Sequence, residues 1–221
     1  VIVVITDLHP HRFWLAPEAD TFVVATPEVA SECRERGVDP ERVRVIGIPI
    51  AKAFHLPVDR AQVLKHLHLD PARRTVLVTS GGMTVGPFEP VVEALLQLEA
   101  SVPGRVHLLI VCGENAAAAR RLQRRVDEGA MPARVFGFVD NMYELMSISD
   151  LLIAKPGGAT TCESLVKGLP MIMMAPIPGQ ESQNAEWLSS HHAAFKIKEV
   201  SEIKEIVKRI GKKAECIVVM L

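Results

Sequence analysis

Short apolar runs alternate with longer amphipathic segments from residue 75 to the end of the chain. The apolar runs occupy residues 75–79, 106–112, 133–138, 150–154, 170–175 and 194–198. Apolar residues recur at helical spacing between them, so each run predicts a strand and each intervening segment a helix. This alternation is typical of β-α-β units with helices on both faces of a parallel sheet. The pattern therefore predicts an α/β domain with a doubly wound parallel sheet.

Three further apolar runs precede this domain, at residues 1–5, 21–25 and 43–47. The first two predict buried strands and the third another strand, and residues 27–36 predict a helix. Glycine and proline at residues 47–49 punctuate the chain, as they often do at domain crossings. We place a boundary near Ile48. Residues 1–48 are then the C-terminal part of an N-terminal domain whose beginning is expected to be absent, and residues 49–221 form a second domain.

Charge and composition exclude several classes of partner. The 25 lysine and arginine residues nearly cancel the 26 aspartate and glutamate residues, so no overall field favours nucleic acid. The four cysteines are far apart and form no C-x-x-C pair, so neither a zinc site nor a disulfide framework is predicted. No apolar run approaches the roughly 20 residues that span a bilayer. We expect a soluble protein in a reducing cytosol.

The end of the chain has two interpretations. Apolar residues recur there at helical spacing and form a stripe: Ile203, Ile206, Val207 and Ile210. The basic residues between them are Lys204, Lys208, Arg209, Lys212 and Lys213. The stripe indicates a last helix packed on the sheet, with a solvated basic face. The basic residues alone are also compatible with contact to anionic lipid.

A glycine pair stands where an apolar strand is predicted to run into a helix, in "KPGGATTCE" (residues 155–163). Glycines allow close backbone approach to a ligand, and a helix N-terminus offers free N–H donors to an anion. We predict a diphosphate cradle, with Glu163 one turn into the helix accepting hydrogen bonds from ribose hydroxyls. The cradle comprises Pro156, Gly157, Gly158, Ala159, Thr160 and Thr161. The alternative is a tight strand-to-helix turn without a ligand.

A second polar loop follows the next predicted strand, in "APIPGQESQNAEWL" (residues 175–188). Gln180, Glu181 and Asn184 arrive together at the start of a helix. Amide and carboxylate groups supply the donors and acceptors that vicinal hydroxyls require, so we predict a sugar-binding loop. The alternative makes Glu181 a first-turn charge that faces the helix dipole, and Asn184 a surface residue.

Two more loops belong to the same predicted edge of the sheet. "TSGGMTVGPF" (residues 79–88) contains Gly81 and Gly82, which could bring backbone groups close to the diphosphate. "GFVDNMYELM" (residues 137–146) places Phe138 and Val139 where backbone groups could pair with a base edge. The alternatives are an ordinary glycine turn in the first loop and a core phenylalanine in the second.

The first predicted strand ends in a polar cluster, "TDLHPHRFW" (residues 6–14). Strand ends are where parallel sheets present reactive side chains to a cleft. A histidine or an aspartate there has the chemistry of a general base. Without other information, Asp7 is a turn cap, His9 and His11 are surface residues and Trp14 is a core residue.

The motifs "KPGGATTCE" and "PIPGQESQNA", in this order and separation, resemble the donor domain of GT-B glycosyltransferases that make glycosyldiacylglycerols. These are the monogalactosyldiacylglycerol synthases and the processive diacylglycerol glucosyltransferases. "TDLHPHRFW" and "VIGIPI" are similar to the segment that crosses from the acceptor to the donor domain. The resemblance covers almost the whole chain and implies two Rossmann-like domains.

The resemblance also implies an activity and residues for it. The family suggests inverting transfer of a hexose from a UDP-sugar to diacylglycerol, without a catalytic metal or other cofactor. The site would lie on the cytosolic membrane face, or at the plastid envelope in a plant. Asp7 matches the family's T-D aspartate and His11 its H-x-x-W histidine, so these two become the candidate bases. Trp14 would line the acceptor approach, while His9 has no clear counterpart.

Two alternative functions remain open at this stage. UDP-N-acetylhexosamine epimerases share the two-domain architecture, and a non-catalytic nucleotide-sugar binding module would share the donor site. The family's N-terminal domain normally begins about a hundred residues earlier, in the ordinary size range of a domain. We therefore expect this chain alone to bind donor but to be inactive. The identity of the hexose does not follow from the sequence.

Overall fold

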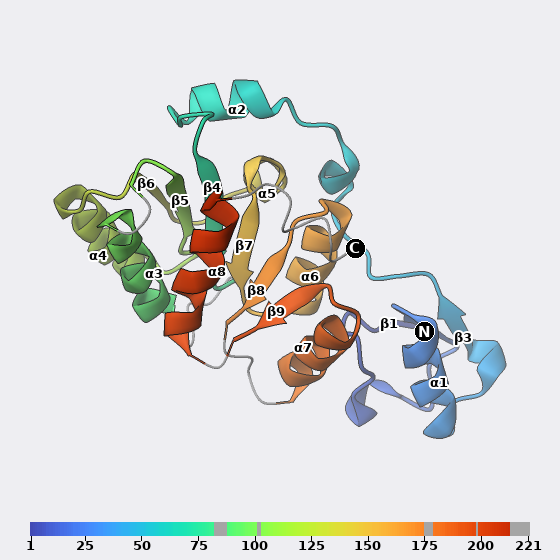
Figure 1. The fold of residues 1–221 in the computed structure, drawn as a ribbon. Coiled ribbons are helices and arrows are strands. Elements are labelled where there is room, and N and C mark those ends of the chain that lie inside the picture. Colours follow the sequence, from blue (N-terminus) through green and yellow to red (C-terminus); the bar gives the residue numbers. More distant parts are fainter. Residues whose placement is uncertain (82–87, 101–102, 175–178, 198, 213–221) are drawn as a thin grey trace.

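The computed structural model describes residues 1–81, 88–100, 103–174, 179–197 and 199–212, and they form two parallel sheets (Figure 1). The first is a 3-stranded sheet of order β1-β2-β3, made of β1 (Ile2–Val4), β2 (Thr21–Val24) and β3 (Val43–Val45). Helix α1 (Pro27–Glu35) packs on it. We call residues 1–45 the N-terminal unit. Its strands and its helix agree with the predicted positions.

The N-terminal unit has a small core of its own. The buried residues are Ile5, Ala19, Phe22, Val24, Val29, Ala30 and Cys33. The prediction that the first strand is buried is wrong, because Ile2 is 69% exposed and Val4 is 41% exposed. Strand β1 lies at the edge of the sheet, and α1 covers β2 and β3. Apolar composition alone does not distinguish an edge strand from a central one.

The second sheet is 6-stranded, with the order β6-β5-β4-β7-β8-β9 and parallel pairing throughout. We call residues 52–212 the C-terminal unit. Its strands are β4 (Arg74–Thr79), β5 (Val106–Val111), β6 (Ala133–Phe136), β7 (Leu151–Ala154), β8 (Met171–Met173) and β9 (Ala194–Lys196). Each lies within or beside its predicted run. The order reverses between β4 and β7, and ligands of open α/β sheets bind at such a switch point.

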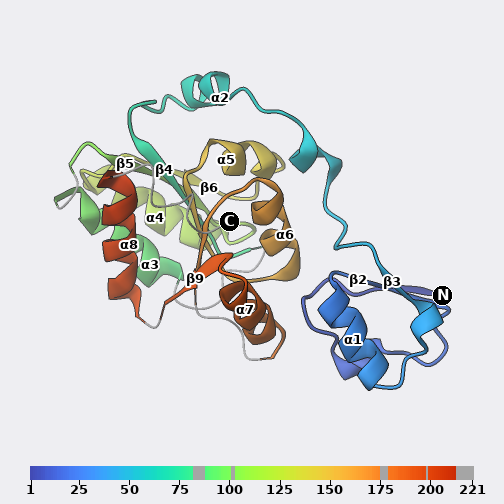
Figure 2. The same cartoon turned by 45° about the vertical axis from the view of Figure 1, so that its right-hand side comes forward.

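Helices cover both faces of this sheet, as the doubly wound prediction requires (Figures 1 and 2). One face packs against α3 (Phe88–Leu96), α4 (Ala116–Glu128) and α8 (Val200–Lys212). The other packs against α2 (Arg60–His66), α5 (Met142–Ile148) and α7 (Gln180–Ser190), with α6 (Gly158–Val166) beside them. The described part of the chain also contains the short 3-10 helices η1 (Arg12–Trp14), η2 (Pro40–Arg42), η3 (Lys52–His55) and η4 (Gln97–Ala100).

The basic C-terminal helix is a packing element. Ile203 and Val207 of α8 are fully buried in the core that this helix shares with α3. This confirms the interpretation of the apolar stripe as a sheet-facing side. No helix in the described parts of the chain combines the length and the apolar character that crossing a membrane requires.

The two units have separate sheets (Figure 2), yet side chains of the two units are in contact. Leu8, which follows β1, is 5% exposed and belongs to the core of the C-terminal unit. The predicted division near Ile48 falls in the segment between β3 and η3, and Ile48 itself packs against that second core. The end of the first strand is therefore held against the larger unit.

Candidate functional site

A cavity of about 290 Å³ lies at the carboxyl edge of the larger sheet. It joins residues from loops that are far apart in sequence: Thr79, Gly81, Val111, Gly113, Phe138, Val139, Met142, Met146, Thr160 and Glu163. Five of these were predicted for the donor site, and they come from three of the four predicted loops. Gly82 lies outside the described residues. The cavity is thus where the sequence predicts a nucleotide.

Glu163 reaches this cavity from the second turn of α6. Burial raises the pKa of its carboxyl group above the ordinary value, because a low-dielectric surrounding disfavours the charged form. A ligand that donates hydrogen bonds to the carboxylate would stabilise that charged form. Paired ribose hydroxyls have this property, which fits the predicted role of Glu163.

Phe138 is not buried in the core, although one interpretation of the sequence made it a core residue. Its side chain is 73% exposed at the cavity, so the core alternative is wrong. Val139 beside it is half-buried and packs on the second core. Phe138 and Val139 therefore form an open side of the cavity, which we call the platform.

The N-terminus of α6 is open only in part. Gly157 has no atom within 4 Å of the place a side chain would occupy, and Ala159 is exposed. At Gly158, by contrast, a Cβ atom would stand 1.7 Å from the carbonyl oxygen of Thr6. The close approach that this glycine permits is therefore to the N-terminal unit. Thr161 is fully buried, whereas Thr160 lines the cavity.

Two buried polar residues that the sequence interpretation did not assign flank the switch point. Strands β4 and β7 pair as far as Val78 and Ile153, and Ser80 and Lys155 are the residues that follow the ends of these two strands. They are 4% and 7% exposed. Within the described residues, the Ser80 hydroxyl has no hydrogen-bond partner, and Lys155 forms no ion pair. The lysine that ends an apolar run directly before Pro156 is the signal that could have revealed this pair.

Asn184 is fully buried, so its interpretation as a surface residue is wrong. Its Oδ1 accepts a hydrogen bond from the backbone N–H of Leu8 at 2.7 Å. Its Nδ2 donates to Asp7 Oδ1 at 2.7 Å and to the carbonyl oxygen of Pro156 at 3.0 Å. The side chain that was predicted to bind sugar instead connects the two units.

The other residues of the predicted sugar loop begin α7. Gly179 precedes the helix with φ of 103°, a backbone conformation that favours glycine. Glu181 is half-buried in the first turn. Gln180 is the first residue of α7, and its side chain lies outside the described part of the structure.

The polar cluster after β1 divides into separate roles. His9 Nδ1 lies 2.6 Å from Glu32 Oε2, and His9 Nε2 lies 3.1 Å from Arg36 Nη2, so His9 is tied to α1. His11 Nδ1 accepts a hydrogen bond from Phe13 N–H at 3.3 Å, and its ring lies 5.7 Å from that of Trp14. Trp14 packs against the core of the N-terminal unit. Asp7 and the backbone N–H of Leu8 bond to Asn184, whereas the contacts described for His9, His11 and Trp14 lie within the N-terminal unit.

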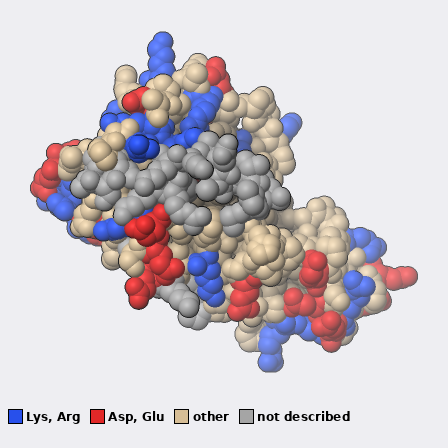
Figure 3. All heavy atoms as spheres, viewed as in Figure 1, with Lys and Arg blue, Asp and Glu red and all other residues tan. Residues whose placement is uncertain are grey.

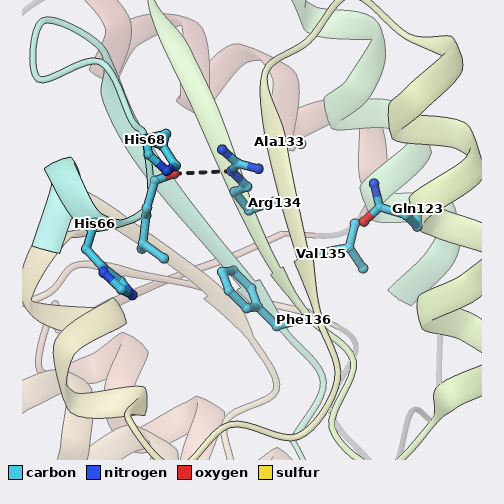
Figure 4. A pocket seen from close by; sticks show the side chains of 8 residues that line it. His66, His68, Gln123, Ala133, Arg134, Val135 and Phe136 are labelled. Atoms are coloured by element: carbon cyan, nitrogen blue, oxygen red, sulfur yellow. Dashed lines mark hydrogen bonds between the residues drawn. The ribbon is translucent and has the colours of Figure 1, made fainter.

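Two further hollows among the described residues contain none of the predicted site residues. One of about 320 Å³ lies beside edge strand β6 and α2, where Arg134 donates a hydrogen bond to the carbonyl oxygen of Leu67 at 3.2 Å (Figure 4). Another overlies the ion pairs Arg121–Glu89 and Arg125–Glu93 between α3 and α4.

Basic and acidic residues are interspersed over the N-terminal unit on the face that Figure 3 shows. The described residues contain no group of three or more side chains suited to a metal ion.

Family models match both parts of the chain. The Glycosyltransferase family 28 C-terminal domain matches residues 75–215, and Monogalactosyldiacylglycerol (MGDG) synthase matches residues 1–50. The first match covers the larger sheet and all four loops predicted for the donor. The second covers the N-terminal unit, including Asp7.

Similar curated proteins are processive diacylglycerol β-glucosyltransferases. That of Bacillus cytotoxicus is 33% identical over 208 residues, which are 94% of this chain and 52% of that protein. That of Bacillus subtilis is 32% identical over 204 residues, covering 92% of this chain and 52% of that protein. The chain spans about half the length of these relatives.

Solved structures share the fold at lower identity. MurG from Acinetobacter baumannii has a TM-score of 0.63 at 16% identity, covering 95% of this chain and 57% of that one. A putative UDP-N-acetylglucosamine 2-epimerase from Listeria monocytogenes has a TM-score of 0.68 at 16% identity, covering 91% and 54%. HepE from Anabaena, solved with UDP, has a TM-score of 0.63 at 15% identity, covering 97% and 63%. These likenesses show the GT-B fold.

Proposed function

We propose that the protein transfers a hexose from a UDP-sugar to diacylglycerol. This proposal starts from the family to which the chain belongs, that of the monogalactosyldiacylglycerol synthases and processive diacylglycerol glucosyltransferases. The observation that carries the proposal is the cavity of about 290 Å³, in which residues of three predicted donor loops meet. Production of glycosyldiacylglycerol from a UDP-sugar by the full-length protein tests it.

In this proposal UDP lies along the carboxyl edge of the larger sheet. The uracil base occupies the platform of Phe138 and Val139, and Glu163 accepts hydrogen bonds from the ribose. The diphosphate faces the open part of the α6 N-terminus, at Gly157, Ala159 and Thr160. Free N–H groups and the helix dipole stabilise an anion there. The buried pair of Ser80 and Lys155 at the switch point adds a hydroxyl and a cation to these donors.

The reaction is a single displacement. Asp7 accepts the proton of the acceptor hydroxyl while that oxygen attacks the anomeric carbon from the face opposite the diphosphate. The carbon–oxygen bond to the diphosphate breaks, its electron pair leaves with UDP, and the configuration at the carbon is inverted. In this proposal the donors around α6 stabilise the leaving charge, without a metal or other cofactor. Gln180 and Glu181 orient the hexose, and Trp14 lies on the acceptor side.

The location and the activity of the chain alone are also proposals. Diacylglycerol is a membrane lipid, so in this proposal the protein meets its acceptor peripherally on the cytosolic membrane face. The chain spans about half the length of its curated relatives. We therefore expect the 221-residue chain to bind UDP but not to glycosylate diacylglycerol.

An epimerase or a binding module has weaker support. The epimerase neighbour is 16% identical and shows only the fold, whereas diacylglycerol glucosyltransferases are 32–33% identical over most of the chain. Isomerisation of a UDP-sugar without diacylglycerol would favour the epimerase. Binding without turnover by the full-length protein would favour the module.

Glu163→Gln is expected to weaken UDP binding by about 1–3 kcal/mol, because the carboxylate loses charge-assisted hydrogen bonds with the ribose hydroxyls. Calorimetry should also show that UDP affinity falls as the pH falls towards the raised pKa of Glu163, because protonation removes the accepting charge. Glu186→Gln, at an exposed position of α7, is the matched control. Equal UDP affinity of the Glu163→Gln and unaltered proteins would refute the ribose assignment.

A further inference from the structure

The side chain of Asn184 joins three segments that belong to different parts of the reaction proposed above. Asp7 and Leu8 come from the end of the first strand in the N-terminal unit. Pro156 belongs to the loop before α6, and Asn184 itself lies on α7. Asn184 and Asp7 are separated by 177 positions in the sequence. A fully buried side chain with these partners has a fixed position.

The orientation of the Asn184 amide follows from its partners. The Leu8 N–H is only a donor, so the amide oxygen must face it. The amide nitrogen then faces the Asp7 carboxylate and the Pro156 carbonyl oxygen, both of which are acceptors. Both N–H groups are used in this way, and neither is left to bind a sugar hydroxyl. Reversing the amide would break all three hydrogen bonds.

We infer that Asn184 is a positioning residue for Asp7, and that the donor-binding unit thereby sets the orientation of the base on the acceptor side. The hydrogen bond at 2.7 Å occupies Oδ1 of Asp7 and leaves Oδ2 for the acceptor hydroxyl. The Leu8 N–H bond holds the adjacent backbone, so the carboxylate cannot move independently of α7. This inference rests on the proposed function, because it assumes that Asp7 is the base.

The inference predicts a specific pattern of rates in the full-length protein. Asn184→Ala should lower kcat for glycolipid formation by about 10–100-fold, the scale of a base displaced by about 1 Å. The dissociation constant for UDP should change less than about twofold, since the nucleotide contacts are elsewhere. Gln183→Ala, at the preceding exposed position, should leave both quantities unchanged.

A double-mutant cycle separates positioning from a merely structural role. If Asn184 acts through Asp7, adding Asn184→Ala to Asp7→Asn lowers the residual rate no further. If the same factor is lost in both backgrounds, Asn184 does not position Asp7 and the inference is overturned. Asn184→Ser, which adds no charge beside Asp7, replaces Asn184→Ala in the cycle if the alanine variant does not fold.

The same measurements distinguish this inference from the two proposals on which it rests, the glycosyltransferase function and the assignment of Asp7 as the base. An unaltered protein that forms no glycolipid would overturn the proposed function and the inference together. A fully active Asp7→Asn variant would overturn the base assignment and the inference, while the donor site would stand. If Asp7→Asn is inactive and Asn184→Ala lowers the rate by the same factor with and without it, the positioning role alone would be overturned.

Discussion

Asp7→Asn in the full-length protein is expected to lower kcat for glycolipid formation by about 10²–10⁴-fold, the usual contribution of a general base. Asparagine preserves the shape of Asp7, and its amide oxygen can still accept the hydrogen bond from Asn184. The change therefore removes the proton acceptor and leaves the contact between the units. UDP affinity should be unchanged, and steady-state kinetics with calorimetry measures both quantities.

His11→Ala is the informative comparison, because the sequence names His11 and Asp7 as candidate bases. In the structure His11 Nδ1 accepts the Phe13 N–H, so in the neutral ring the proton lies on Nε2. That tautomer offers no free nitrogen lone pair to an acceptor hydroxyl. We therefore expect a smaller loss from His11→Ala than from Asp7→Asn. The reverse order would assign the base to His11.

Gly158→Ala is expected to have the second large effect. Its Cβ atom would stand 1.7 Å from the Thr6 carbonyl oxygen and 3.3 Å from Asp7 Oδ1. Backbone must move to relieve such an overlap, at a cost of about 1–3 kcal/mol of unfolding free energy. The movement also displaces Asp7 from α6, so kcat should fall by about 10²-fold.

Thermal unfolding and kinetics together test this effect. Gly157→Ala is the control for stability, because Gly157 has no atom within 4 Å and its φ is −68°. It should leave the unfolding temperature almost unchanged. If Gly158→Ala were as stable and as active as the unaltered protein, the contact between Thr6 and α6 would be irrelevant to catalysis.

The periodicity of the sequence predicts the fold well because nearly every strand is a compact apolar run. The central strands β4, β5 and β7 are buried on both faces and therefore read as continuous apolar segments. Strand β1 has the same composition, yet its side chains are largely exposed at an edge. A strand's place in the sheet depends on pairing with distant segments, which a local pattern does not contain.

The loops of the site follow from the sequence, but several contacts within them do not. Glu163 and Phe138 reach the cavity as expected because parallel strands bring their carboxyl ends to one edge. Gly158 was assigned to the ligand, whereas its missing side chain accommodates Thr6. Asn184 was assigned to the sugar, whereas it bonds Asp7. These two contacts join segments separated by about 150 residues or more, and no local spacing reveals them.

The central claim is that the full-length protein moves a hexose from a UDP-sugar to diacylglycerol. The most direct test supplies that protein with diacylglycerol in detergent micelles and a panel of UDP-sugars, and identifies the lipid product by mass. The account predicts a lipid heavier than diacylglycerol by one or more hexose residues, formed with stoichiometric release of UDP. UDP-sugar isomerisation without any glycolipid, or UDP binding without turnover, would contradict it.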